Sequence, residues 1–137
     1  MTARSFFDTN ILIYADDRSA PEKRDRALGL IAEHRRAGTG VVSLHVLQEY
    51  FVTATKKLRV DPRIARRKVE LLAEFDVAGT DLSDILAAAD LHLLHGFSFW
   101  DALVMRSAKQ SGCTVLLTED MQERREIDGV LIVNPFR

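Results

Sequence analysis

The chain has 137 residues, of which 47% are hydrophobic, and its formal net charge at pH 7 is −1. This length fits one domain with its own core, spanning 1–137, and the balanced charge gives no global signal for nucleic acid binding. The single cysteine excludes an internal disulfide and a paired-cysteine zinc site, and no apolar run is long enough for a membrane span or a signal peptide, so we expect a cytoplasmic protein with Cys113 in its core.

The predicted elements begin with a short buried strand that contains Phe6 and Phe7 and ends at Asp8. A helix follows at once, and Asp8 is well suited to cap it. Further along we expect a helix from Pro21 to Gly38, a strand over 40–43, a helix capped by Ser43, a helix opened by Asp61–Pro62, a short strand over 75–79, a helix from Asp81 to Gly96, a helix from Ser98 to about Gln110, a strand over 114–118, a polar connection over 119–128 and a last strand over 130–133.

Short apolar strands that alternate with helices predict an α/β domain. Such strands form a parallel sheet that is covered by helices on both faces. In sheets of this kind, ligands bind beyond the carboxyl ends of the strands, at the point where the strand order reverses. Acidic residues near those strand ends are therefore the first candidates for function.

Four acids are predicted to meet at this edge. Asp8 ends the first strand, Glu49 lies in the helix after the second strand, and Asp120 follows the strand over 114–118. Asp101 joins them if its helix begins at the same edge and runs back to feed that strand. Carboxylates that meet in this way repel one another unless they are protonated or neutralised by a cation. Mg²⁺ or Mn²⁺ with oxygen ligands resolves the repulsion, and either ion supports phosphodiester hydrolysis.

Each acid also has a purely structural interpretation. Asp8 can serve only as a helix cap, Asp101 fits a Ser-x-x-acid capping box with Ser98, and Glu49 and Asp120 can be exposed side chains. His45 and Glu49 lie four residues apart on one helix face and could share a metal, although a core or surface histidine is the commoner case. The aromatic pair Phe99 and Trp100, at a helix start, is expected to pack into the core.

A basic segment follows the second predicted strand and its helix. Such a run is usually a solvated helix face, and its sharper interpretation is a surface that contacts RNA phosphates. The candidates for phosphate contact are Lys56, Lys57, Arg59, Arg63, Arg66 and Arg67, and Lys68 ends the same run.

With these residues in view, the chain resembles the PIN-domain ribonucleases, and more narrowly the VapC toxins of VapBC toxin–antitoxin modules. The resemblance spans nearly the whole chain in the right order. It is carried by Phe7-Asp8-Thr9-Asn10-Ile11-Leu12, Leu47-Gln48-Glu49-Tyr50-Phe51, Ser98-Phe99-Trp100-Asp101-Ala102-Leu103, Leu116-Leu117-Thr118-Glu119-Asp120-Met121-Gln122 and the tail from Gly129 to Phe136.

The resemblance implies a three-layer α/β/α fold around a mainly parallel, five-stranded sheet, with the first strand beside the fourth. It implies an acidic quartet that holds Mg²⁺ or Mn²⁺, made by Asp8, Glu49, Asp101 and Asp120. Polar support is implied for Thr9, Asn10 and Thr118. The implied activity is endonucleolytic cleavage of RNA. The implied partners are a second copy in a homodimer, with the helices between Ser43 and Phe75 as candidate surfaces, and a cognate VapB-like antitoxin whose C-terminal segment covers the acidic pocket.

Two other functions compete with this one. A haloacid-dehalogenase-type phosphatase also places an aspartate after its first strand, but it needs a second acid two residues later, where this chain has Asn10. A PIN-like binding module without catalysis would have lost one or more of the four acids, and none is missing here. No glycine-rich phosphate loop or Gly-x-Ser-x-Gly motif is present.

Overall fold

The computed structural model describes residues 2–137. The described residues form six helices and six strands, in which single strands alternate with pairs of helices up to β4. The helices are α1 (Thr9–Tyr14), α2 (Pro21–Ala37), α3 (Leu44–Lys56), α4 (Pro62–Leu72), α5 (Leu82–His95) and α6 (Phe99–Gln110). The strands are β1 (Ser5–Phe7), β2 (Gly40–Ser43), β3 (Asp76–Ala78), β4 (Val115–Leu117), β5 (Glu126–Ile127) and β6 (Val130–Val133).

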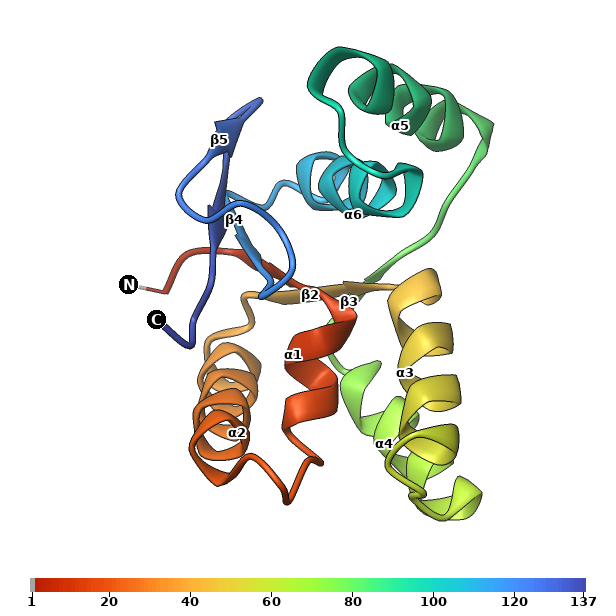
Figure 1. The fold of residues 1–137 in the computed structure, drawn as a ribbon, viewed down its shortest axis with the longest axis vertical. Helices are drawn as coiled ribbons and strands as arrows, with labels where there is room; N and C mark the ends of the chain where they lie inside the picture. The colour runs from red at the N-terminus through yellow and green to blue at the C-terminus, as the bar shows by residue number, and fades with distance from the viewer. Residues whose placement is uncertain (1) are drawn as a thin grey trace.

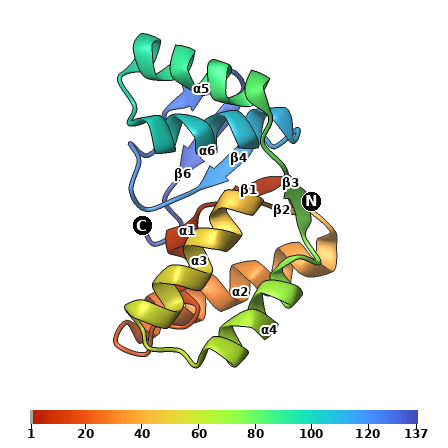
Figure 2. The same cartoon turned by 90° about the vertical axis from the view of Figure 1, so that its right-hand side faces the viewer.

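One sheet lies between two groups of helices. Its strand order is β3-β2-β1-β4-β6-β5, and every neighbouring pair is parallel except β5 with β6. Helices α1 to α4 lie on one side of the sheet, whereas α6 covers the other side and α5 packs outside it (Figures 1 and 2). The predicted three-layer α/β/α fold is confirmed, and so is the pairing of the first strand with the fourth.

The five parallel strands are the five that the sequence predicts, and the sixth was not predicted. Strand β5 lies within the segment that we expected to be only a polar connection, and it pairs antiparallel with β6. The turn between them consists of Asp128 and Gly129, which both have positive φ, at 51° and 83°. A two-residue turn with positive φ at both positions matches the twist of a β-hairpin, and Asp-Gly is a favoured sequence for it.

The helix starts follow the predicted caps. The side chains of Asp8, Ser43, Asp61 and Ser98 each accept a hydrogen bond from a backbone N–H in the first turn of α1, α3, α4 and α6. Such a bond satisfies one of the free N–H groups that begin every helix. These caps place the starts of α1 and α3 directly after β1 and β2, so the strand ends and the helix starts share one edge of the sheet.

The core is centred on the middle strands. Phe6, Val41, Leu116 and Ile132 lie on four adjacent strands and are fully buried, and Cys113 is buried as predicted. None of the helices within residues 2–137 is both long enough and apolar enough to cross a membrane.

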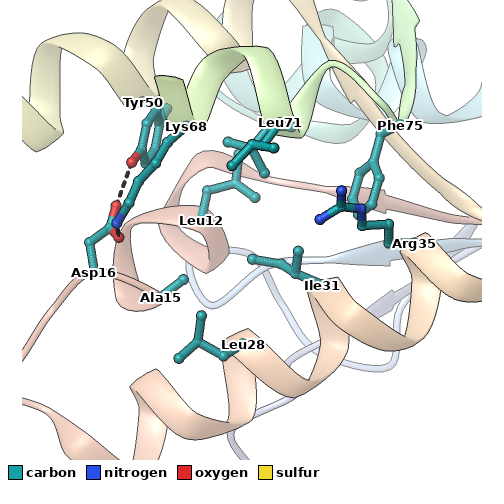
Figure 3. Close-up of a pocket in the computed structure, with 11 residues that line it drawn as sticks. Leu12, Ala15, Asp16, Leu28, Ile31, Arg35, Tyr50, Lys68, Leu71 and Phe75 are labelled. Atoms are coloured by element: carbon teal, nitrogen blue, oxygen red, sulfur yellow. Dashed lines mark hydrogen bonds and ion pairs between the residues drawn. The ribbon is translucent and has the colours of Figure 1, made fainter. Parts of the chain in front are cut away.

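A small apolar cavity of about 170 Å³ lies between α1, α2, α3 and α4 (Figure 3). At one end of it, the carboxylate of Asp16 accepts hydrogen bonds from the Tyr50 hydroxyl and the Lys68 ammonium. Burial and the bond to Asp16 raise the pKa of the Tyr50 hydroxyl above its ordinary value. None of the four predicted acids lines this cavity, so it is separate from the acidic edge.

Candidate active site at the carboxyl edge of the sheet

The parallel sheet brings the predicted acids to one edge. Asp8 follows β1 directly, Glu49 lies in the second turn of α3 after β2, and Asp120 lies three residues beyond β4. Asp101 lies in the first turn of α6, which runs back along the sheet to feed β4 (Figure 2). Because β1 and β4 are neighbours in parallel register, Asp8 and the segment after Leu117 are adjacent, and the Asp8 N–H donates to the Leu117 carbonyl.

Asp8 is the buried member of the group, with 7% of its surface exposed. One carboxylate oxygen accepts from the Thr9 N–H at 2.8 Å, and the other accepts from the Thr118 hydroxyl at 2.8 Å. Burial raises the pKa of Asp8 to about 6; the bonds from Thr118 and Thr9 oppose this rise, and the charges of Glu49 and Asp101 add to it. Asp8 therefore caps α1, and the charges of nearby acids raise the pKa of its carboxyl.

Asn10 and Thr118 tie the two middle strands together at the site. The amide nitrogen of Asn10 donates to the Thr118 hydroxyl at 3.2 Å and to the carboxylate of Asp120 at 3.0 Å. The amide oxygen of Asn10 accepts from the Glu119 N–H at 3.2 Å. The fully buried Thr118 hydroxyl also accepts from the Asp120 N–H at 3.2 Å. These bonds fix the loop after β4 against the start of α1.

Glu49 reaches the same edge from α3. Its Oε1 accepts from the Thr9 hydroxyl at 2.8 Å and lies 3.3 Å from Nε2 of His45, one turn earlier on the same helix. The side chain of Glu49 is 46% exposed. Thr9 therefore joins Asp8 to Glu49 through its backbone and its hydroxyl.

Asp101 completes the group electrostatically. The Ser98 hydroxyl accepts from the Asp101 N–H at 3.1 Å, so the predicted cap forms through the backbone of Asp101. Burial raises the pKa of the Asp101 carboxyl, the Ser98 hydroxyl lowers it, and the charges of Asp120 and Glu49 raise it. Each of the four carboxylates thus interacts with at least one of the others.

The carboxylates do not form a closed metal cage. Across residues 2–137, no three histidine, cysteine, aspartate or glutamate side chains lie close enough together to hold one metal ion as they stand. Asp8 is fixed by its hydrogen bonds, whereas Glu49 and Asp120 are exposed and Asp101 is half-buried. Binding of one cation by all four carboxylates would therefore require movement of Glu49, Asp101 and Asp120 toward it.

Two features of the site were missed at the sequence level. Glu119, beside Asp120, accepts from the Tyr14 hydroxyl and from the Lys23 ammonium, both at 2.6 Å, and so anchors the loop after β4. The prediction that Trp100 packs into the core is wrong, because its side chain is 57% exposed and stacks on the ring of His45. The residues next to Trp100 give no signal for this exposure, because the ring on which it stacks lies on α3.

The basic segment begins at the end of α3 that lies farther from the acids. Helix α3 leads from the sheet edge, and Lys56 ends it seven residues after Glu49, about 10 Å further along the helix axis. Arg66 and Arg67 form exposed ion pairs with Glu70, which contribute little to stability. Arg59, in the loop between α3 and α4, is exposed and has a positive φ of 57°.

The comparison with protein families decides the classification. Residues 5–127, which hold all four acids, match the PIN domain. The chain belongs to the PIN domain family. The predicted family is thus confirmed, and the haloacid-dehalogenase interpretation has no support. The comparison with curated proteins gives no match.

Three solved structures are similar to this chain. VapC20 of Mycobacterium tuberculosis, described as a toxin that cleaves the sarcin–ricin loop, is 18% identical with a TM-score of 0.67, over 82% of this chain and 86% of that one. A toxin–antitoxin complex from Klebsiella pneumoniae is 22% identical with a TM-score of 0.68, and DNA-bound VapBC from Salmonella typhimurium is 19% identical with a TM-score of 0.67; both cover 96% of this chain and 97% of the other. At these identities the likeness establishes the shared fold.

Proposed function

We propose that this PIN domain is a metal-dependent endoribonuclease that acts as the toxin of a type II toxin–antitoxin pair. The observation that carries the proposal is the buried Asp8, whose pKa is raised by burial and by the charges of Glu49 and Asp101. Carboxylates that gather in this way repel one another at neutral pH, and a bound cation removes that repulsion. Membership in the PIN family and the fold shared with VapC20 support the choice of nuclease and toxin.

The residues at the edge fit a hard divalent cation in their chemistry. Every donor is a carboxylate oxygen, which suits Mg²⁺ or Mn²⁺ better than softer metals. We assign Asp8, Asp101 and Asp120 as ligands, directly or through water, and Glu49 as a further ligand or as the group that orients the attacking water. When bound, the cation would lower the pKa of a coordinated water molecule and neutralise negative charge on the phosphate.

The other side chains prepare this site. Thr9 and Thr118 donate to Asp8 and hold its carboxylate in one orientation. Asn10 donates to Asp120 and so keeps the loop after β4 close to Asp8. Because these donors are in place in the folded chain, the orientation of Asp8 and the position of the loop that carries Asp120 are set before a cation binds, and preorganisation of this kind is what gives electrostatic catalysis its strength.

Cleavage by an Asp8→Asn variant is the direct test. A single-stranded RNA is incubated with wild type and variant at matched fold, judged by circular dichroism, with EDTA, Mg²⁺ or Mn²⁺. We expect metal-dependent cleavage with 5′-phosphate ends by wild type and little or none by the variant. Equal cleavage by the two proteins contradicts the mechanism. Binding of RNA without any cleavage by wild type favours the catalytically silent module instead.

Metal binding provides an independent test. Titration calorimetry with Mn²⁺ compares wild type with Asp120→Asn, and with Asp90→Asn as the control, because Asp90 is an exposed acid on α5 away from the edge. Loss of a direct ligand should weaken Mn²⁺ binding about tenfold or more, as loss of an outer-shell group does. Equal weakening by both variants would show only a general charge effect and would count against the site.

The basic segment is proposed to contact RNA phosphates away from the cleaved bond. Reversing Lys57, Arg59 and Arg63 to glutamate should weaken RNA binding and flatten its dependence on salt, because each phosphate contact releases counterions. The control reverses Arg36, a basic residue in the last turn of α2 outside the segment, and its effect is compared for each charge reversed. A salt slope unchanged by the triple reversal removes this part of the proposal.

Two partners belong to the proposal. The complexes from Klebsiella pneumoniae and Salmonella typhimurium motivate a VapB-like antitoxin that covers the acidic pocket. Toxicity on expression, relieved by the product of a neighbouring small gene and absent for Asp8→Asn, is the expected result. The homodimer is tested by sedimentation equilibrium, and a monomer at micromolar concentration would contradict it.

A further inference from the structure

Trp100 is the second residue of α6 and directly precedes Asp101. Its side chain is 57% exposed, although indole is among the side chains that gain most from burial. One face of the indole is covered by the imidazole of His45, with ring centroids 4.9 Å apart and an angle of 9° between the planes. Phe99 contacts the indole in a T-shaped arrangement at 5.3 Å. The ring is therefore held in place on one side and open on the other.

The stacked pair is attached to the acidic edge. His45 lies at the start of α3, and its Nε2 is 3.3 Å from Oε1 of Glu49. The same Glu49 oxygen accepts from the Thr9 hydroxyl, one residue after Asp8. A continuous series of contacts thus joins the open indole face to the acids that we assign to catalysis.

At the acidic edge itself, phosphate contacts with basic side chains contribute little, so RNA gains there from binding energy that is not ionic. The chain has a net charge of −1, and its edge concentrates carboxylates that repel RNA phosphates. Stacking of a base on an aromatic ring is independent of phosphate charge and contributes about 1–3 kcal/mol for each base. A flat, rigid and exposed indole beside the acids supplies such a surface.

We propose that Trp100, backed by His45, is a stacking platform for an unpaired base of the RNA next to the cleaved bond. This inference rests on the proposed nuclease function and narrows its substrate to single-stranded RNA or loops. A base within a duplex has both of its faces covered by neighbouring pairs, whereas a splayed base can stack on an aromatic side chain.

Trp100 is the only tryptophan of the chain, so its fluorescence reports on this position alone. The binding probe is a short oligoadenylate, and the protein is the Asp8→Asn variant, so that the RNA is not cleaved. Binding of the RNA is measured separately by fluorescence anisotropy. The comparison ligands are the same strand annealed to oligouridylate and a ribose-phosphate oligomer of equal length without bases. We expect the single strand to quench the indole emission, and the duplex and the baseless oligomer to leave it nearly unchanged.

Affinity supplies the second measurement. In the same background, Trp100→Ala should weaken binding of the single strand by about fivefold to a hundredfold and leave binding of the baseless oligomer unchanged. Trp100→Phe should lose less, because a smaller ring still stacks. The matched control is Leu93→Ala, which removes an apolar side chain that is 80% exposed on α5, and it should leave the affinity unchanged.

Several outcomes overturn the inference, and they separate it from the nuclease proposal. If the oligoadenylate binds but Trp100→Ala binds it equally well, the platform is wrong while the nuclease proposal stands. If the emission of the RNA-free protein at micromolar concentration is already that of a buried indole, a second copy covers Trp100 and the platform is again wrong. If no RNA binds at all, the proposed function fails together with the inference.

Discussion

Replacing Asp8 by asparagine should make the metal-free protein more stable at neutral pH, even though it removes the central acid. The Asp8 carboxyl ordinarily titrates near 3.8, and in the fold its pKa is raised to about 6 by burial. Between these values the folded state keeps a proton that the unfolded chain has released. The contribution of Asp8 to stability is therefore complete below about pH 4, falls between about pH 4 and pH 6, and is lost above that range. Asparagine carries no charge, so the variant does not lose stability in this pH range.

The size of the effect follows from the two pKa values. At about 1.4 kcal/mol for each pH unit between them, the wild type loses about 3 kcal/mol above pH 7. The amide reproduces the bonds from Thr118 and Thr9 only in part, which costs about 1 kcal/mol. We therefore expect Asp8→Asn to be more stable than wild type by about 1–3 kcal/mol near pH 8, and to be equal to it or slightly less stable near pH 4.

Urea unfolding in EDTA, followed by circular dichroism at several pH values, measures this difference. The difference between variant and wild type cancels groups that titrate in both proteins, and Asp90→Asn controls for the loss of one negative charge on the surface. A stability difference that stays constant from about pH 4 to about pH 8 would falsify the assignment of Asp8 as a buried, charge-strained carboxyl. Saturating Mn²⁺ should reverse the order at neutral pH, because wild type binds it more tightly.

Three further predictions concern the fold. Gly40→Ala should lower the free energy of unfolding by about 1–3 kcal/mol, because a Cβ there would lie 2.6 Å from the ring of the buried Phe75. Gly29→Ala, which has open space around it in the middle of α2, should raise the free energy of unfolding by up to about 1 kcal/mol, and equal effects of the two variants in urea unfolding would contradict this. Tyr50→Phe should cost about 1.5–3 kcal/mol by removing a donor to the carboxylate of Asp16, and a neutral result in thermal unfolding would argue against that bond. Asp81→Ala should cost about 1 kcal/mol by deleting the capping box of α5, and amide hydrogen exchange should show faster opening of that helix and not of α2.

The acidic edge could be predicted because it follows from local rules and strand order. Asp8 stands at the point where an apolar run ends and a helix begins, and Asp101 stands in the first turn after a capping serine. Once the strands are parallel, their carboxyl ends share an edge regardless of packing detail. The PIN match over residues 5–127 confirms the family that these motifs predict. The roles of the individual acids remain proposals.

The unpredicted features depend on contacts between distant segments or on a turn that was overlooked. The Asp128-Gly129 pair was a readable hairpin signal, because positive φ at both positions favours those two residue types. By contrast, no local pattern indicates that Trp100 stays exposed, since its place is set by a ring on α3, more than fifty residues earlier in the chain.

The sequence by itself determined the order of helices and strands, the caps and the edge at which the acids gather, because these depend on neighbours within a few residues and on the strict polarity of parallel strands. Only the tertiary structure decided how the acids are held: Asn10 reaches Asp120 across 110 residues of chain, and Thr118 reaches Asp8 across the same distance. It also decided the raised pKa of Asp8, since burial by the surrounding core is a property of the whole fold. Asp8 is thus both a helix cap, as its local sequence predicts, and a strained carboxyl, as only its surroundings reveal.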